Sequence, residues 1–530
     1  MMRAQRWGWL LGALLAAAGC GDSDEGGKSP GGSGGAGATG GSATGGAGGA
    51  TGGSGGSGAG ATGGVGATGG SAGSAGQAGQ AGQAGQAGQA GAGGSGGGTG
   101  GSGGNPGVEI DFDPTLLPLV SASFPAGIQA GDPTSDKAVL WTRYAGTGTL
   151  LVRVFTPTSA GKSLLFHESV ATPSSDGFVH VDADGLPALA DLSYVFLEQQ
   201  GGTFVARSDI GRVVTAPLPG HKAVIRFGGT SCTSNSRAPF DALDKGGELN
   251  LDFIILAGDT TYNDSATTLA QYRAKWQEQI GEGTYQKFLQ STAHYATWDD
   301  HEVDNDWNPE TFSPTRLAAA RQTFFEYLPI RRAVSAPDRI WRSYRWGDTL
   351  EVFVLDSRGE RKPSTRNTPN AEYLSNEQLA WLQAGLSAST ATFKVIVNSV
   401  PITNFPGLFD LAQADRWEGY AAQRTKLLEY IATSAIKGVL FVSGDFHLGA
   451  SATVEPSGAW SDLREVLMGP GDQNANPLWT TLPTSQFEFR TGTSNVTVFE
   501  ANPNATPPTI KVTFVNGQGA SLFDKTYSFP

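Results

Sequence analysis

Short apolar runs that end in a polar, chemically capable residue recur through the second half of the chain. Runs such as LDFIILAGD and GVLFVSGDFH have the length and the β-branched content of buried strands. Open α/β sheets place their functional groups at the carboxyl ends of such strands. One ending of this kind would mean little, but the repetition indicates that one sheet edge gathers a site. The residues at these endings are Cys232, Asp259, Asp299, Asp300, Asp356, Arg358, Asn398, Asp445 and His447.

Helical stretches alternate with these strands, which predicts an α/β domain over residues 218–530. The candidate helices are residues 313–328, 374–387 and 420–436. Ser375, followed three residues later by Gln378, has the spacing of a capping box at the start of the second helix.

Residues 109–217 have a different pattern, with short alternating runs separated by turn-rich pieces. This pattern predicts a small β-sandwich, and Tyr194 has the place of a tyrosine corner that would tie such a sandwich together. About 420 residues remain after the N-terminal region, more than one core usually supports, so two domains are expected.

The stretch ATWDDHEVDNDW, residues 296–307, crowds carboxylates around His301. Acids this close raise one another's pKa unless a cation holds them. A solvated acidic loop is the simplest interpretation, but the stretch follows a strand and therefore belongs to the sheet edge described above. It also lacks the ligand spacing of a calcium-binding helix-loop-helix. Its acids are Asp299, Asp300, Glu302, Asp304 and Asp306.

The residue types at the strand ends favour two kinds of metal ion. Cysteine, histidine, tyrosine and aspartate together suit a trivalent or borderline ion, whereas the surplus of carboxylates suits a harder cation such as Ca²⁺ or Mg²⁺. The chain has only two cysteines, Cys20 and Cys232. Cys232 is either an inert buried thiol or a metal ligand, and its place after a strand favours the ligand.

Residues 1–20 have the layout of a secretory signal peptide, with basic residues, an apolar run too short to span a membrane, and small residues before Cys20. The end resembles a bacterial lipobox and predicts an extracytoplasmic lipoprotein held in the cell envelope. The alternative is ordinary cleavage, which would give a soluble secreted product. Residues 21–108 are dominated by Gly, Ala, Ser, Thr and Gln, a composition that predicts a disordered tether.

From residue 124 to about residue 450 the chain resembles the alkaline phosphatase D family, the PhoD-like metallophosphatases. FPAGIQAGDPTSDKAVLWTRY is similar to the start of that family's N-terminal domain, and GTSC, LAGDTTY, TWDDHEVDNDW, LDSRGER and VSGDFHLGA are similar to its catalytic blocks, in order. The resemblance implies a calcineurin-like metallophosphatase domain with four layers, αββα, over residues 218–530. It implies a fibronectin-III-like β-sandwich over residues 109–217.

The resemblance also implies hydrolysis of phosphate monoesters or diesters with Fe³⁺ and Ca²⁺ as cofactors. In GTSC, Cys232 matches the cysteine that binds Fe³⁺. In GDTTY, Asp259 matches the aspartate that bridges the two kinds of ion, and Tyr262 matches the iron-bound tyrosine. In GDFH, His447 matches the histidine on iron.

The remaining matches concern the second metal and the substrate. Asp300 and Asp445 stand at positions that bind the second metal, and His301 stands at the histidine that contacts the phosphate or the leaving group. Asn305 is a candidate for a calcium contact and Arg358 for a phosphate contact. The block GDTTYN departs from the family's usual Gly-Asp-Tyr-Ile-Tyr followed by an acid, which puts the substrate in doubt more than the chemistry.

Two other functions stay open at this point. A non-catalytic surface protein stiffened by calcium would not need the thiol, phenol and imidazole donors, because calcium prefers oxygen ligands. A metallo-oxidase would leave the second acidic site without a role. The formal net charge of −13 makes nucleic acid an unexpected partner, and the sequence does not indicate an oligomeric state.

Overall fold

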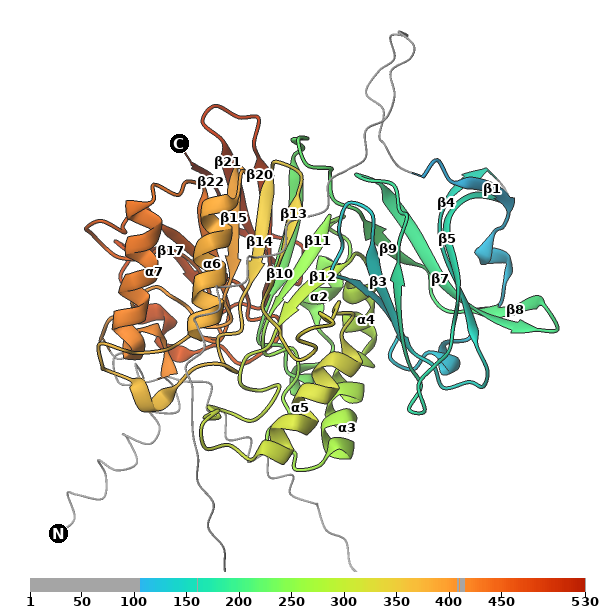
Figure 1. The fold of residues 1–530 in the computed structure, drawn as a ribbon, viewed down its shortest axis with the longest axis horizontal. Helices are drawn as coiled ribbons and strands as arrows, with labels where there is room; N and C mark the ends of the chain where they lie inside the picture. The colour runs from blue at the N-terminus through green and yellow to red at the C-terminus, as the bar shows by residue number, and fades with distance from the viewer. Residues whose placement is uncertain (1–104, 160, 408, 410–414, 530) are drawn as a thin grey trace, which may run out of the picture. The chain divides into compact units, whose positions relative to one another are not determined.

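The computed structural model describes residues 105–159, 161–407, 409 and 415–529 (Figure 1). The predicted signal peptide and the predicted tether lie outside these ranges, except for the last residues of the tether. Within the described ranges, no helix combines the length and the apolar character needed to cross a membrane.

Two large sheets form the centre of the described fold. The nine-stranded sheet has the order β22 (Ser521–Ser528), β21 (Thr509–Asn516), β20 (Asn495–Asn502), β10 (Ile225–Thr230), β11 (Phe253–Ala257), β12 (His294–Thr297), β2 (Ile128–Gly131), β3 (Ala138–Arg143) and β6 (Phe178–Ala183). The seven-stranded sheet has the order β13 (Arg342–Trp346), β14 (Leu350–Val354), β15 (Phe393–Val397), β16 (Val439–Ser443), β18 (Arg464–Leu467), β17 (Gly449–Thr453) and β19 (Phe487–Thr491).

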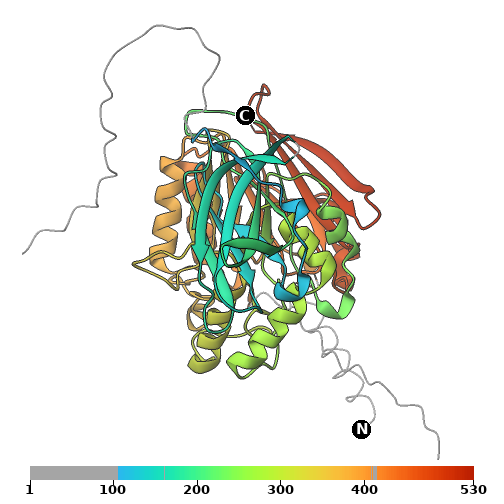
Figure 2. The ribbon, with the colours of Figure 1, turned by 90° about the vertical axis from the view of Figure 1, so that its right-hand side faces the viewer.

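Side chains alternate between the two faces of each strand, so each sheet packs one face against the other sheet and the opposite face against helices. The result is four layers: helices, sheet, sheet and helices (Figure 1 and Figure 2). In β11, Phe253 and Ile255 face the seven-stranded sheet, whereas Ile254 and Leu256 pack against helices. In β14, Phe353 packs against the helices on the opposite outer face. The helices on the nine-stranded sheet are α2 (Asp241–Gly246), α3 (Leu269–Ile280), α4 (Gly283–Gln290) and α5 (Pro314–Tyr327); those on the seven-stranded sheet are α6 (Asn376–Ala388) and α7 (Ala421–Thr433).

The strands that end in polar residues are parallel within each sheet. Strands β10, β11 and β12 pair in parallel in one sheet, and β14, β15, β16 and β18 do so in the other. Parallel strands end at the same edge of a sheet, so the residues that follow them are brought close together.

The N-terminal residues form a sandwich that shares a sheet with the rest of the protein. One layer is a six-stranded sheet, and β2, β3 and β6 form the other, with a common apolar core. Strand β2 pairs in parallel with β12 at Gly131 and His294, so the nine-stranded sheet continues across the predicted boundary at residue 217. The strands of the six-stranded sheet are β1 (Val108–Asp111), β5 (Lys162–Ala171), β4 (Leu150–Ser159), β7 (Asp191–Gln200), β8 (Thr203–Arg207) and β9 (Gly211–Val214).

The prediction of a tyrosine corner at Tyr194 is wrong. Tyr194 lies inside β7, opposite Val154 of β4 and Gly211 of β9, and its ring is fully buried. Among the described residues its hydroxyl has no hydrogen-bond partner, whereas a tyrosine corner requires a bond to the backbone. The ring packs in the apolar core of the sandwich. Gly211 leaves room for the ring, because a Cβ at that position would lie 2.3 Å from it.

The capping box predicted at Ser375 forms only in part. The Ser375 hydroxyl accepts a hydrogen bond from the Gln378 backbone N–H at 3.1 Å, as expected for a helix N-cap. The Gln378 side chain, however, bonds to both backbone groups of Asp356 instead of returning to the cap. A complete capping box starts α3, between Thr268 and Gln271.

Candidate metal centre

The strand endings place four polar side chains on strained turns. Cys232 follows β10, Asp259 follows β11, and Asp445 and His447 follow β16. Their φ angles are +54°, +53°, +69° and +50°, in the left-handed region that residues other than glycine seldom adopt. Such strain persists where the surrounding structure enforces it, and it concentrates at functional sites.

Three of these residues form the first group of candidate ligands. The thiol of Cys232, a carboxylate oxygen of Asp259 and a ring nitrogen of His447 all lie within 4.8 Å of one another, and all three residues are buried. Ligands held about 2.0–2.3 Å from one ion have separations of this size. The hydroxyl of Tyr262 lies 3.2 Å from His447 Nε2, so the fourth predicted residue lies beside the group.

Two further groups of candidate ligands are linked to the first through shared residues. Asp259, Asp300 and His301 form one, and Asp299, Asp300 and Asp445 form the other, each with its ligand atoms within 4.8 Å. Asp259 and Asp300 are each shared between two groups. The predicted ligand residues therefore lie in one continuous cluster at the ends of both sheets.

Burial makes the ionised forms of these side chains unfavourable in free energy unless cations are bound beside them. Burial, and then the negative charge of Asp259, raise the pKa of the Cys232 thiol well above its usual range. Burial and neighbouring acids likewise raise the pKa values of Asp259 and Asp445 well above theirs. Removing charged groups from water costs several kcal/mol each, and metal ions are the strongest local compensation.

The donor chemistry fits two different kinds of ion. Thiolate, imidazole and phenolate donors around Cys232, Tyr262 and His447 suit iron, which accepts soft and borderline ligands. The carboxylates of Asp300 and Asp445 suit a hard cation such as Ca²⁺. Asp259 stands between the two sets and can serve both.

Arg358 is the main internal counter-charge of the cluster. Its guanidinium is fully buried and binds Asp299 through two hydrogen bonds, of 2.6 and 3.1 Å. It also donates to Asp445 at 3.2 Å and to Asp415. Although burial raises the pKa of Asp300, the positive charges of Arg358 and His301 lower it below its usual range overall.

The acids of the stretch 296–307 have separate roles. Asp299 pairs with Arg358, a role that the sequence did not reveal, and also accepts a hydrogen bond from Ser399 at 2.7 Å. Glu302 is fully buried and accepts the backbone N–H groups of Asp259, Thr260 and Asp299 at 3.2, 2.5 and 2.8 Å.

Glu302 thus connects the turn that carries Asp259 to the turn that carries Asp299.

The two other acids lie toward the surface. Asp304 pairs with Arg316 at 3.0 Å, and it accepts the backbone N–H of Ser265. The backbone N–H of Asp306 donates to Asp300 at 2.7 Å, and the exposed Asp306 carboxylate accepts a hydrogen bond from the Asn305 side chain at 3.1 Å. Charge crowding in the sequence is therefore relieved by different partners for each acid.

His301 has a partner that sequence reasoning missed. Its Nδ1 lies 2.8 Å from one oxygen of Asp264 and 2.9 Å from the other. Asp264 also accepts the backbone N–H of Asn305 at 2.8 Å, so it joins the turn after β11 to the acidic stretch. No spacing signal predicts this pair, because the residues come from two separate strand endings.

A segment beyond the recognised blocks supports the turn of Cys232. Ser231 donates to the backbone oxygen of Met468 at 2.8 Å and accepts, through its own backbone oxygen, the N–H of Gly471 at 2.7 Å. Further along, the backbone N–H of Asn476 donates to the backbone oxygen of His447 at 3.2 Å. This segment therefore contacts both turns of the first ligand group.

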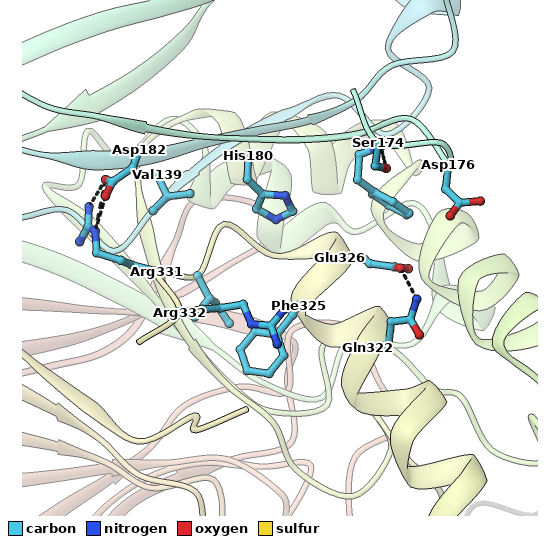
Figure 3. Close-up of a pocket in the computed structure, with 12 residues that line it drawn as sticks. Val139, Ser174, Asp176, His180, Asp182, Gln322, Phe325, Glu326, Arg331 and Arg332 are labelled. Carbon is cyan, nitrogen blue, oxygen red and sulfur yellow. Dashed lines mark hydrogen bonds and ion pairs between the residues drawn. The ribbon is translucent and has the colours of Figure 1, made fainter. Parts of the chain in front are cut away.

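A pocket of about 690 Å³ lies apart from these groups, between the N-terminal sandwich and α5 (Figure 3). Polar side chains in its lining bind one another, as Arg331 does with Asp182 at 2.7 Å and Gln322 with Glu326 at 2.7 Å. None of its lining residues belongs to the candidate ligand groups. The pocket is a groove between two parts of the fold, not part of the metal centre.

Comparison with known proteins shows the family and the fold of this chain. The PhoD-like phosphatase profile matches residues 227–511, and the profile of the PhoD-like phosphatase N-terminal domain matches residues 117–217. The chain is 28% identical to alkaline phosphatase D of Bacillus subtilis (strain 168) over 382 residues, which are 62% of this chain and 65% of that protein. The alignment thus spans just under two thirds of the relative's length.

Two solved structures share the fold. A structure of PhoD matches with a TM-score of 0.65 at 21% identity, over 77% of this chain and 89% of that one. A purple acid phosphatase from yellow lupin seeds matches with a TM-score of 0.55 at 12% identity, over 80% of this chain and 75% of that one. The likeness confirms the predicted metallophosphatase fold with its N-terminal domain. The chain belongs to the PhoD-like phosphatase family.

Proposed function

We propose that this protein is a metal-dependent phosphoesterase that hydrolyses phosphate monoesters, diesters or both. The observation that carries the proposal is the continuous set of ligand groups around Asp259 and Asp300, with His301 beside both. Membership of the PhoD-like family and the similarity to alkaline phosphatase D support the same chemistry.

In this proposal Cys232, Tyr262, Asp259 and His447 would hold Fe³⁺, and Asp259, Asp300 and Asp445 would hold Ca²⁺, with Asn305 as a further calcium contact. Bound as a pair, such ions would lower the pKa of bound water and hold phosphate oxygens, the chemistry needed for water to attack phosphorus. The clustered acids act as ligands and not as general bases.

The other residues position and stabilise the substrate. His301 contacts the phosphate or the leaving oxygen, where an imidazole can stabilise the developing charge or supply a proton. Asp264 fixes the orientation of that ring through its contact with Nδ1. Arg358 would supply a positive charge for a phosphate oxygen, although Asp299 and Asp445 share its guanidinium.

We further propose that the enzyme works outside the cytoplasm, either lipid-anchored at Cys20 or secreted, with residues 21–108 as a tether. The composition of the N-terminal region supports this location. A tethered enzyme would meet phosphate esters at the cell surface, and the net charge of −13 disfavours nucleic acid as a partner.

The test compares hydrolysis of p-nitrophenyl phosphate and bis-p-nitrophenyl phosphate by protein purified without chelator and with calcium present. Turnover of either ester that falls to background in Asp259→Ala supports the proposal. Absence of turnover of both esters, in protein that contains iron and calcium, contradicts it.

Cys232→Ser separates the proposal from a non-catalytic, calcium-stabilised binding protein. A phosphoesterase should lose iron, measured by elemental analysis, together with activity. A protein that uses calcium only for rigidity should keep its metal content and its stability in this variant, because calcium does not use a thiolate ligand.

A further inference from the structure

Asp415 is surrounded by more positive charge than one carboxylate requires. One of its oxygens lies 2.6 Å from Arg361 Nη1 and 3.9 Å from Arg366 Nη2, and the other contacts Arg358 Nη1. Among the described residues, Asp415 is the only carboxylate within 4.0 Å of Arg361 and Arg366. Within the described part of the chain, Asp415 is therefore the direct ionic partner of both arginines.

The remaining contacts of the two arginines are with neutral groups. Arg361 is fully buried and donates to the backbone oxygens of Trp307 at 2.9 Å and Asp415 at 3.1 Å. Arg366 donates to the hydroxyl of Tyr420 at 3.1 Å. These bonds hold both guanidinium groups in place without neutralising them, which is the arrangement expected of an anion site.

This arginine cluster adjoins the metal centre. A single guanidinium, that of Arg358, contacts Asp415 on one side and Asp299 and Asp445 on the other. Asp445 belongs to a candidate ligand group. An anionic group in the place of the Asp415 carboxylate would therefore lie one guanidinium away from the reacting phosphate.

The cluster is open to solvent on one side. The side chains of Asp415 and Arg366 are 24% and 28% exposed, whereas Arg358 and Arg361 are buried. A phosphate group from solution can approach past Arg366. A phosphate group carries more charge than a carboxylate and has an extra oxygen, so it can accept hydrogen bonds from several arginines at once.

We propose that Arg361 and Arg366, with Arg358 between them and the metal centre, form a second anion subsite that binds another phosphate group of the substrate. In this structure the Asp415 carboxylate occupies that subsite. The inference rests on the proposed phosphoesterase function and narrows its substrate to molecules with two phosphate groups a few bonds apart.

The first experiment measures binding by isothermal titration calorimetry, with propylphosphonate and propane-1,3-diyl bisphosphonate as non-hydrolysable probes. The wild-type protein should bind the bisphosphonate about tenfold more tightly, as expected for one additional charged hydrogen-bonding contact. Arg366→Gln should reduce this ratio to near one. Lys362→Gln is the matched control, because it removes the same charge from an exposed lysine that pairs with Glu372, and the ratio should persist.

Asp415→Asn gives an independent test with the opposite sign. Without its charge, residue 415 competes less for the arginines, so the bisphosphonate should bind at least threefold more tightly relative to propylphosphonate. A purely structural Asp415 would instead weaken both probes together. Circular dichroism melting of each variant shows whether it folds.

Equal affinity of the wild-type protein for the two probes, or a preference that survives in Arg366→Gln, overturns the subsite. Hydrolysis of p-nitrophenyl phosphate, measured on the same preparations, tests the proposed function separately. A protein that hydrolyses this ester but does not prefer the bisphosphonate retains the function and loses the subsite. A protein that prefers the bisphosphonate without hydrolysing any ester loses the function and retains an anion site.

Discussion

His294 should make the folded protein less stable as the pH falls. Its ring is buried in β12, and among the described residues neither ring nitrogen has a hydrogen-bond partner. Burial lowers the pKa of His294 from 6.5 to about 3; the carboxylate of Asp132 opposes this shift, and Arg342 reinforces it. The backbone oxygen of His294 also accepts the N–H of Asp132 at 3.1 Å, where the N-terminal strands join the nine-stranded sheet.

The sign of the effect follows from the lowered pKa. Above pH 6.5 the ring is neutral in both states, and its contribution to stability is fully present; it is lost as the pH falls toward the folded pKa of about 3. At pH 4.5 the unfolded chain binds a proton that the folded chain excludes. Because pH 4.5 lies about two units below the unfolded pKa of 6.5, this costs about 3 kcal/mol of unfolding free energy.

Urea unfolding followed by tryptophan fluorescence, at pH 7.5 and pH 4.5, measures this cost. His294→Gln removes the titrating group, so the advantage of the wild-type protein over the variant should shrink by about 3 kcal/mol between the two pH values. Titration of all other groups cancels in this comparison. A stability difference for His294→Gln that does not change with pH would refute the reasoning.

Three further substitutions test the positioning contacts. Asp264→Asn should lower kcat about 10- to 100-fold with iron and calcium content unchanged, because the ring of His301 loses its charged partner; an unchanged kcat, or restored activity only when metal is added, would contradict this role. Glu302→Gln should lower the unfolding free energy by about 1–3 kcal/mol, because an amide cannot accept all the backbone N–H groups that the carboxylate accepts; denaturant titration that gives the wild-type midpoint would exclude it. Arg342→Met should cost about 3–5 kcal/mol in the same assay, since it leaves the buried Asp132 without its closest cation; a loss below about 1 kcal/mol would show that this pair contributes no more than an exposed salt bridge.

Much of the fold follows from local patterns in the sequence. The candidate helices at 313–328, 374–387 and 420–436 correspond to α5, α6 and α7, and the apolar runs correspond to the parallel strands of two sheets. Parallel pairing has a fixed geometric consequence, because all strand endings meet at one edge. This is why Cys232 and His447, which lie far apart in the chain, could be assigned to one site before any contact was known.

Residues whose role depends on a distant partner could not be predicted in this way. Gln378 has the spacing of a capping box, but its side chain binds Asp356, which a different strand presents to it. Tyr194 has the surroundings of a tyrosine corner in the sequence, yet its hydroxyl lies within the core of the sandwich. In both cases a tertiary contact replaced the local one.

The sequence by itself determined the order of strands and helices, the chemistry of the strand endings and the family of the protein. Only the tertiary structure decided which acid binds which partner. Asp299 and Asp300 are adjacent in the chain, but Asp299 accepts two hydrogen bonds from Arg358 and belongs to one candidate ligand group, whereas Asp300 belongs to two. The reason is physical: local propensity selects strands and turns, whereas the pairing of buried charges is set by the long-range packing that brings separate strand endings together.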